Sequence, residues 1–261
     1  MLNMNDFKLF SDLHRQQKPL VLGNVWDVTS ANACQDAEYS ALGTSSAAIA
    51  TSLGYQDGEE MSFGELLRVV RDIKRATNIP LSVDLEAGYG LEPAEIINNI
   101  MSLTQIGIVG INLEDSIVVD GLRTLLPRDE FAKKLGEISN IIKKKNIDIF
   151  LNIRTDTYLL KVEDILTQTL ERIRLYTKNG ASGIFIPGLV IEDDIQEICS
   201  QCTLPVNVMC MPGLPDFDRL TGLGVKRISM GNFVYDKMAR DLRDTLNSIL
   251  MSDGLQTIFE R

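Results

Sequence analysis

Two acidic residues stand one position apart at the end of an apolar run in SVDLEAGYG, residues 82–90. Asp84 and Glu86 share one face of an extended strand, because successive side chains alternate between faces. A third acid, Glu114, ends the next apolar run, VGINLEDS (109–116). Carboxylates that emerge from buried strands are costly unless they are paired or bind a metal. These hard oxygen donors, without a neighbouring Cys or His, predict a site for Mg²⁺ or Mn²⁺ rather than for zinc.

The other interpretation of these acids is a set of salt bridges with Arg154 and Arg227. A metal with few protein ligands, in contrast, leaves positions for two oxygens of an α-keto acid. Arg154 ends a further apolar run and suits a carboxylate or a developing enolate oxygen. The GTSS stretch (43–46) offers hydroxyls and backbone N–H donors where a helix starts. An ordinary helix N-cap would use the same GTSS residues.

The elements that must position these residues form eight repeats of a strand followed by a helix. Near-continuous apolar runs are typical of parallel strands that are buried on both faces. Eight such units in about 230 residues predict a (β/α)₈ (TIM) barrel. Residues 1–261 would form this one domain, with an N-terminal helix before the first strand. A doubly wound sheet is the alternative. Active sites of barrels lie at the carboxyl ends of the strands, where Asn207 of the seventh strand is a further candidate for substrate binding. The strands are predicted at 19–25, 39–46, 79–88, 109–116, 147–156, 182–189, 204–210 and 225–231.

Composition excludes several classes of function. The 261 residues hold 26 Lys and Arg against 36 Asp and Glu, and a net charge of −10 argues against non-specific nucleic-acid binding. No run of eighteen apolar residues predicts a transmembrane helix, and residues 1–19 lack the features of a signal peptide. We therefore expect a cytoplasmic protein, and the acids with Arg154 indicate a small-molecule carboxylate substrate.

The four cysteines are expected to be thiols rather than disulfides. CSQC (199–202) has no second Cys pair with which to bind a metal. The only histidine, His14, lies far from the acids in the sequence.

Taken in order, these motifs resemble those of the isocitrate lyase/phosphoenolpyruvate mutase superfamily over about residues 6–245. SVDLEAGYG resembles its metal-binding element, GINLEDS its next acidic strand end and LNIRTDTYL its A-R-T-D element. GTSSAAIATSLGYQDGEEM resembles the segment that holds the substrate carboxylate, followed by a loop aspartate. PVNVMCMPG and LGVKRISMG match the late strands. The motifs indicate the superfamily but not a particular reaction.

The resemblance implies a role for each matching residue. Asp84 would be the direct metal ligand, while Glu86 and Glu114 would hold the water molecules of the metal. Asp57 matches the loop aspartate that contacts the reacting group. The residues that would contact the substrate are Ser45, Ser46, Asp84 and Arg154, with Arg154 also catalytic. The resemblance also implies a homotetramer, or at least a dimer, in which C-terminal helices are swapped between subunits.

The departures from the family pattern narrow the reaction. Lyases with tricarboxylate-type substrates carry K-[KR]-C-G-H after the strand-four acid, where this chain has EDSIVVDGLRTLLPRDEF. Phosphonomutases have a lysine and often an asparagine in the same loop, and both are missing here. FIPG (185–188) also lacks the glutamate of the lyase F-P-E motif. Isocitrate cleavage is therefore disfavoured and C–P chemistry is in doubt. Arg123 could supply a positive charge from this loop, but we expect it to be solvated.

These observations predict a Mg²⁺-dependent lyase that cleaves a C–C bond next to the carbonyl of a small 2-oxo or 2-hydroxy carboxylate. Decarboxylation or retro-aldol cleavage would give an enolate held by the metal and Arg154. The alternatives are a phosphonomutase or hydrolase that acts on phosphonopyruvate-like substrates, and a barrel that binds a keto acid without turnover. Residues 116–127, with breaks at Gly121 and Pro127, are predicted to form an irregular loop that covers the mouth and excludes water.

Overall fold

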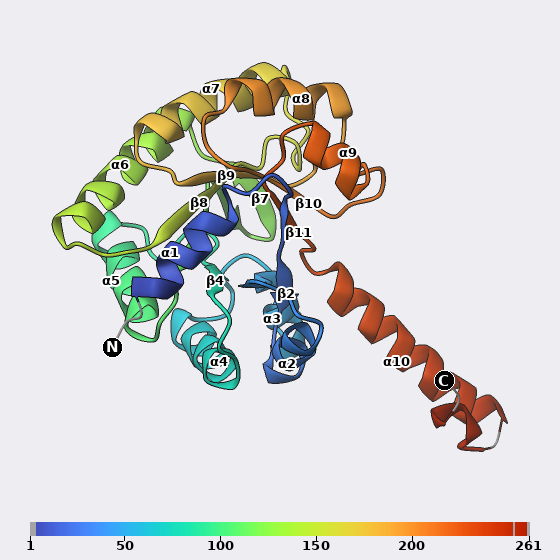
Figure 1. Cartoon of the computed structure of the whole chain (residues 1–261). Coiled ribbons are helices and arrows are strands. Elements are labelled where there is room, and N and C mark those ends of the chain that lie inside the picture. Colours follow the sequence, from blue (N-terminus) through green and yellow to red (C-terminus); the bar gives the residue numbers. More distant parts are fainter. Residues whose placement is uncertain (1–3, 253, 260–261) are drawn as a thin grey trace.

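A parallel sheet that returns on itself forms the centre of the computed structural model, which describes residues 4–252 and 254–259 (Figure 1). Residues 1–3 of the N-terminal segment, and Asp253, Glu260 and Arg261 of the C-terminal one, lie outside the described residues. The parallel strands are β1 (Leu20–Val21), β2 (Gly23–Val25), β3 (Leu42–Thr44), β4 (Leu81–Asp84), β5 (Gly110–Glu114), β8 (Phe150–Arg154), β9 (Gly183–Ile186), β10 (Val206–Met209) and β11 (Arg227–Ser229).

The first strand unit closes the barrel. Only Leu22 separates β1 from β2, and these two short strands pair with opposite ends of the sheet: β1 with β11 and β2 with β3. Counting β1 and β2 as one unit gives the eight predicted units in the described part of the chain, and every pairing around the sheet is parallel. The predicted (β/α)₈ barrel is therefore confirmed.

Helices cover the outside of the barrel (Figure 1). The helix α4 buries Leu66, Val70 and Ile73 at a helical spacing and begins with a capping box between Ser62 and Glu65. The short helix α3 was not expected as a separate element. The helices are α1 (Met4–Leu13), α2 (Val28–Asp36), α3 (Ser46–Leu53), α4 (Phe63–Ala76), α5 (Pro93–Gln105), α6 (Arg128–Lys144), α7 (Ile165–Lys178), α8 (Glu192–Gln201), α9 (Phe217–Gly222) and α10 (Phe233–Ser252), with a 3₁₀ turn at Gln256–Ile258.

The helix α1 packs under the amino-terminal ends of the strands. Phe10 of α1 belongs to a small apolar cluster with Leu22 and Phe150, and Gly110 makes room for its ring. His14 stacks on Phe150 with a centroid distance of 4.3 Å, and its Nδ1 donates to the Phe10 carbonyl over 2.7 Å. Burial lowers the pKa of His14 to about 3, so the ring is neutral. The only histidine thus belongs to the floor of the barrel, at the end opposite to the acids.

The segment after β5 is a β-hairpin, so the expectation of an irregular loop was wrong. Its strands β6 (Ser116–Val119) and β7 (Leu122–Leu125) pair antiparallel. Asp120 and Gly121 connect them with φ of +51° and +77°, the positive values that a two-residue type I′ turn requires. The Asp-Gly pair between two apolar runs was the signal for this hairpin. No helix in the described residues is long and apolar enough to cross a membrane.

Candidate active site

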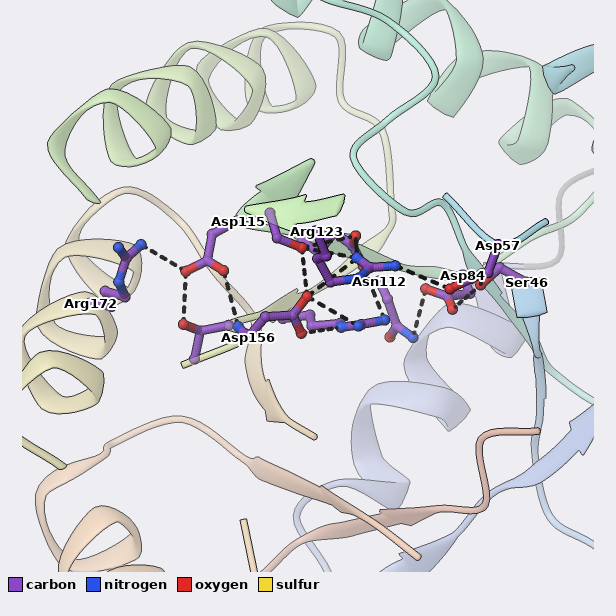
Figure 2. A network of polar contacts seen from close by, with 12 residues as sticks. Ser46, Asp57, Asp84, Asn112, Asp115, Arg123, Asp156 and Arg172 are labelled. Atoms are coloured by element: carbon purple, nitrogen blue, oxygen red, sulfur yellow. Dashed lines mark hydrogen bonds and ion pairs between the residues drawn. The ribbon is translucent and has the colours of Figure 1, made fainter. Parts of the chain in front are cut away.

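Charged side chains converge at the carboxyl end of the barrel (Figure 2). Asp84 is the last residue of β4, and Glu114 and Arg154 are the last residues of β5 and β8. The strand register sets Glu114 opposite Arg154. Parallel strands of a barrel end at one rim, so consecutive units deliver their last residues to the same place. The structure therefore brings the predicted acids and the predicted arginine to one mouth.

Arg154 is held by two acids. Its Nε and Nη2 donate to the two carboxylate oxygens of Asp156 over 2.6 and 3.1 Å, and its Nη1 lies 3.0 Å from Glu114 Oε2. Although burial disfavours the charge, the negative charges of Glu114 and Asp156 raise the pKa of Arg154, so the guanidinium stays charged. The salt-bridge interpretation thus holds for Glu114. Its Oε2 nevertheless has no hydrogen-bond partner within the described chain.

Arg123 points into the site, so the expectation of a solvated arginine was wrong. It comes from β7, and its side chain is only 15% exposed. Its Nη2 donates to Asp57 Oδ2 over 3.1 Å, while its Nη1 contacts Glu114 and lies 3.3 Å from Asp156 Oδ2. The hairpin turns this residue inward, as the alternative interpretation of Arg123 required. Arg123 joins the loop aspartate to Glu114 at the end of β5 and to Asp156, two residues after β8 (Figure 2).

Asp84 lies beside the start of α3. Ser46 Oγ is 2.9 Å from Asp84 Oδ2 and 3.3 Å from Asp57 Oδ1, so this hydroxyl donates to one of the two acids. Burial raises the pKa of Asp84, against the attraction of Arg154. Ser45 accepts from the backbone N–H of Ala48 over 3.3 Å and is the N-cap of α3, as the simpler interpretation of GTSS predicted.

Glu86 has two partners that were not predicted from the sequence. Its carboxylate accepts from the Glu59 N–H over 2.9 Å and from the Tyr89 hydroxyl over 2.6 Å. Burial and the nearby Asp57 raise the pKa of Glu86 to about 7. Glu86 adopts a φ of +50°, an uncommon value for a residue with a side chain, and such strain concentrates at functional sites. Tyr89 belongs to the same SVDLEAGYG motif as Glu86, whereas Glu59 lies 27 residues away, a separation that no motif reveals.

Two adjoining cavities open at this end. One of about 170 Å³ is lined by Ser45, Ser46, Asp57, Asp84 and Arg154 among others. The other, of about 290 Å³, is lined by Glu86, Glu114 and the hairpin residues Ile117 and Val118. The predicted acids are thus divided between neighbouring spaces. Asn207 lies within the barrel instead, where its Oδ1 accepts from Asn152 over 3.1 Å.

The donor chemistry of these spaces fits a hard divalent cation. All candidate ligands are oxygens, and the pKa of Asp84 is raised by burial, so a cation would stabilise the ionised acids. In the described residues, no three His, Cys, Asp or Glu side chains are arranged to hold one metal ion directly. A cation that keeps most of its water molecules, as Mg²⁺ usually does, needs fewer direct protein ligands.

The raised pKa of Glu86 predicts a pH dependence of stability. The unfolded carboxyl ionises near 4.5 and the folded one near 7, so the folded state binds the proton more tightly and loses stability as the pH rises through this window. Melting temperatures of the metal-free protein should therefore fall across it. Glu86→Gln should lessen this fall without abolishing it, because burial also raises the pKa of Glu114, to about 8. Added Mg²⁺ should raise the melting temperature more at about pH 8 than at about pH 6. Identical profiles for both proteins would contradict this assignment.

A buried cluster behind the site fixes the segment after β8. Asp115 Oδ2 accepts from Arg172 Nη1 over 2.9 Å, from the Tyr176 hydroxyl over 2.7 Å and from Thr155 Oγ1 over 2.7 Å. Asp115 Oδ1 accepts from the backbone N–H of Asp156 over 3.1 Å. The cluster ties α7 and the Arg154–Asp156 segment to the end of β5 (Figure 2). The sequence showed Asp115 at a strand end but gave no sign of its partners on α7.

Comparison with known proteins gives the family. The phosphoenolpyruvate phosphomutase family model matches residues 10–250. A Mycobacterium tuberculosis protein of uncharacterised function is 35% identical over 226 residues, covering 87% of this chain and 83% of that one. The oxaloacetate decarboxylase of Pseudomonas entomophila (strain L48) is 26% identical over 248 residues, covering 89% and 80%.

Among solved structures, a Burkholderia cenocepacia J2315 protein named provisionally as a phosphonomutase superposes with a TM-score of 0.87 at 36% identity, covering 93% of this chain and 99% of that one. Fold, motifs and sequence matches therefore agree with one another. The chain belongs to the phosphoenolpyruvate phosphomutase family and is an enzyme of the isocitrate lyase/phosphoenolpyruvate mutase superfamily.

Proposed function

We propose that this enzyme is a Mg²⁺- or Mn²⁺-dependent lyase that cleaves a C–C bond next to the carbonyl of a small 2-oxo or 2-hydroxy carboxylate. The observation that carries the proposal is the cavity of about 170 Å³ that Asp84, Ser46 and Arg154 line together. Its size suits a small acid, and its charged walls suit an anion that bears a second polar oxygen. Several relatives named oxaloacetate decarboxylase support this choice of reaction.

The metal would be held by Asp84 directly and by Glu86 and Glu114 through water molecules. When bound, it supplies a Lewis acid that polarises the substrate carbonyl. Arg154 then stabilises the negative charge that develops on the substrate oxygen as the C–C bond breaks, since Asp156 holds its guanidinium in one orientation. Ser46 orients the carboxylate of Asp84 through its hydroxyl. Solvent can supply the final proton, so this site does not need the cysteine acid of the tricarboxylate lyases.

A panel of substrates tests the proposal. Purified enzyme with Mg²⁺ should cleave oxaloacetate or an alkylmalate, and should leave phosphonopyruvate and methylisocitrate intact. Release of phosphate from phosphonopyruvate would favour C–P chemistry, with Asp57 contacting the transferring group. Tight binding of 2-oxo acids without turnover would favour the alternative of a barrel that binds a keto acid but does not cleave it. Assignment to the cytoplasm stays a prediction of the sequence.

The β6–β7 hairpin is proposed to cover the mouth. Ile117 and Val118 line the cavity of Glu86 and Glu114, and Val118 packs where a Cβ on Gly58 would lie. Replacing residues 118–123 by a two-glycine link should lower kcat at least ~10-fold, since the site loses Arg123 and admits water. The control is Leu122→Ser at the exposed tip, which should keep kcat within about twofold. Unchanged turnover in the shortened enzyme would contradict the covering role.

An apolar stripe on α10 is proposed to bind a second subunit. The helix extends away from the barrel (Figure 1). Its exposed apolar residues recur at every fourth position: Val234, Met238, Leu242, Leu246 and Leu250. Contiguous exposed apolar residues of this kind mark interaction sites. The spacing supports the predicted dimer or homotetramer.

Light scattering tests this assembly. The protein should be oligomeric at micromolar concentration, and Leu246→Glu should shift it toward the monomer because a carboxylate at an apolar interface is poorly solvated. Asn247→Glu, which introduces the same charge one residue further along the helix, should leave the oligomer intact. A monomeric wild-type protein would rule out this role of the stripe.

A further inference from the structure

The interior of this barrel is unusually polar. Barrel interiors are generally filled by branched apolar side chains. Here Asn152 Nδ2 lies 2.9 Å from Asn112 Oδ1 and 3.1 Å from Asn207 Oδ1, and Asn112 Nδ2 lies 3.4 Å from Asp84 Oδ1. A chain of amides therefore runs from Asp84 across the neighbouring strands in the barrel interior. Amide dipoles satisfy one another, but they leave any full charge in their midst without a counter-ion.

Arg227 is such a charge. It is the first residue of β11, is 1% exposed, and ranks with the largest fully buried side chains of the described chain. Its Nη2 lies 3.4 Å from Asn112 Oδ1, whereas its Nε and Nη1 have no hydrogen-bond partner in the described residues. Gly43 of β3 leaves space near Nη2, since an added Cβ would lie 3.9 Å from it. Arg227 therefore does not form the salt bridge that the sequence left open.

Two other largely enclosed arginines, Arg154 and Arg172, differ from Arg227 in this respect. Arg154 pairs with Glu114 and Asp156, and Arg172 pairs with Asp115. A buried cation without a partner carries an uncompensated desolvation cost, which a structural role would not require. Burial lowers the pKa of Arg227 to about 10, partly offset by the attraction of Asp84, so it remains charged at neutral pH.

Arg227 lines the cavity of about 170 Å³ together with Ser45, Asp84 and Arg154. We propose that Arg227 binds a carboxylate of the substrate from the inner side of the cavity, opposite the acids at the mouth. This inference deepens the proposed function and rests on it for the identity of the substrate as a 2-oxo or 2-hydroxy acid.

The reaction decides which carboxylate Arg227 binds. Cleavage of a C–C bond by decarboxylation turns one carboxylate into neutral CO₂. A guanidinium bound to that group would stabilise the substrate more than the transition state and slow the step. The carboxylate next to the carbonyl keeps its charge throughout, so binding it costs nothing in the chemical step. Arg227 is thus assigned to the retained carboxylate, and Arg154 to the oxygen that gains charge.

Oxalate is a suitable probe, because it presents a carboxylate beside a second carboxylate whose oxygens mimic an enolate. Binding is measured by calorimetry on the full chain with Mg²⁺, together with the melting temperature of the ligand-free protein. Arg227→Met should bind oxalate about 100-fold more weakly, about 2.7 kcal/mol. Its ligand-free melting temperature should stay equal or rise, because an unpaired buried charge has been removed. Arg219→Met, which removes an exposed arginine paired with Glu192, is the control: it should bind oxalate within about twofold of wild type.

Oxalate affinity within about threefold of wild type in Arg227→Met would overturn the proposal, whatever its melting temperature. If the methionine variant does not fold, Arg227→Gln, which can keep the hydrogen bond to Asn112, carries the same comparison. Oxalate binding needs no turnover. If the wild-type protein cleaves none of the panel but Arg227→Met loses oxalate binding, the anion site stands and the lyase assignment fails. If the wild-type protein cleaves a panel substrate but Arg227→Met keeps its oxalate affinity, the lyase assignment stands and the role of Arg227 fails.

Discussion

Arg154→Lys lowers kcat/KM by roughly 30- to 1000-fold, about 2–4 kcal/mol of transition-state stabilisation. Lysine keeps the positive charge but loses the planar fork. In the structure that fork places Nε and Nη2 on Asp156 and Nη1 beside Glu114, so its orientation is fixed by two acids. The loss should appear in kcat as well as in kcat/KM, since Arg154 acts on charge that develops only as the bond breaks. Steady-state kinetics at saturating Mg²⁺ measure it.

The pairing of Arg154 with Asp156 and Glu114 also gives it a structural role, and Asp156→Asn separates the two. That change weakens the same bidentate contact without removing the guanidinium. Both variants should melt at a lower temperature, but Arg154→Lys should lose more activity for the same loss of melting temperature. Near-normal turnover of Arg154→Lys, with a clear fall in melting temperature, would refute the catalytic assignment and leave an ion pair that only stabilises the fold.

Asp115→Ala lowers the free energy of unfolding by about 3–5 kcal/mol. The carboxylate is fully buried and accepts hydrogen bonds from Arg172, Tyr176 and Thr155, so its removal leaves a buried guanidinium without a counter-ion. Urea unfolding measures the change, with the m-value as the check that the transition stays comparable.

Asp115→Ala combined with Arg172→Met gives the control for that ion pair. The double variant should recover part of the loss, because neither charge is then left alone. A single-variant loss below about 1 kcal/mol would mean that water, rather than Arg172, compensates the charge of Asp115.

The sequence was most informative where one physical rule determines the outcome. Apolar runs separated by helix-period segments predicted the eight-unit barrel, and Asp84, Glu114 and Arg154 fall at the strand ends that this barrel brings together. The hairpin was missed because the Asp120–Gly121 turn signal was read as a break within a loop. Once that element was wrong, Arg123 was placed in solvent although it contacts Glu114 and Asp57.

Other parts of the site depend on which side chains meet across the barrel. Arg227 was considered as a salt-bridge partner of the acids, but it begins β11 and its side chain lies in the barrel interior. Only the positions of all its neighbours show that Arg227 Nε and Nη1 have no hydrogen-bond partner in the described residues. Likewise, Glu59 reaches Glu86 through backbone turns with positive φ, which no spacing rule reveals. The cation proposed between the acids stays a prediction.

The most direct test of the central claim is the rate of pyruvate formation from oxaloacetate, measured in parallel with Mg²⁺, with EDTA and with Asp84→Asn. Mg²⁺ alone, without protein, gives the background. The account predicts turnover at least ~100-fold above this background for the wild-type enzyme, and loss of most of it on chelation or in Asp84→Asn. Turnover that survives both EDTA and Asp84→Asn would contradict the metal-dependent mechanism. Release of phosphate from phosphonopyruvate, with oxaloacetate left at the background rate, would contradict the assignment of C–C cleavage.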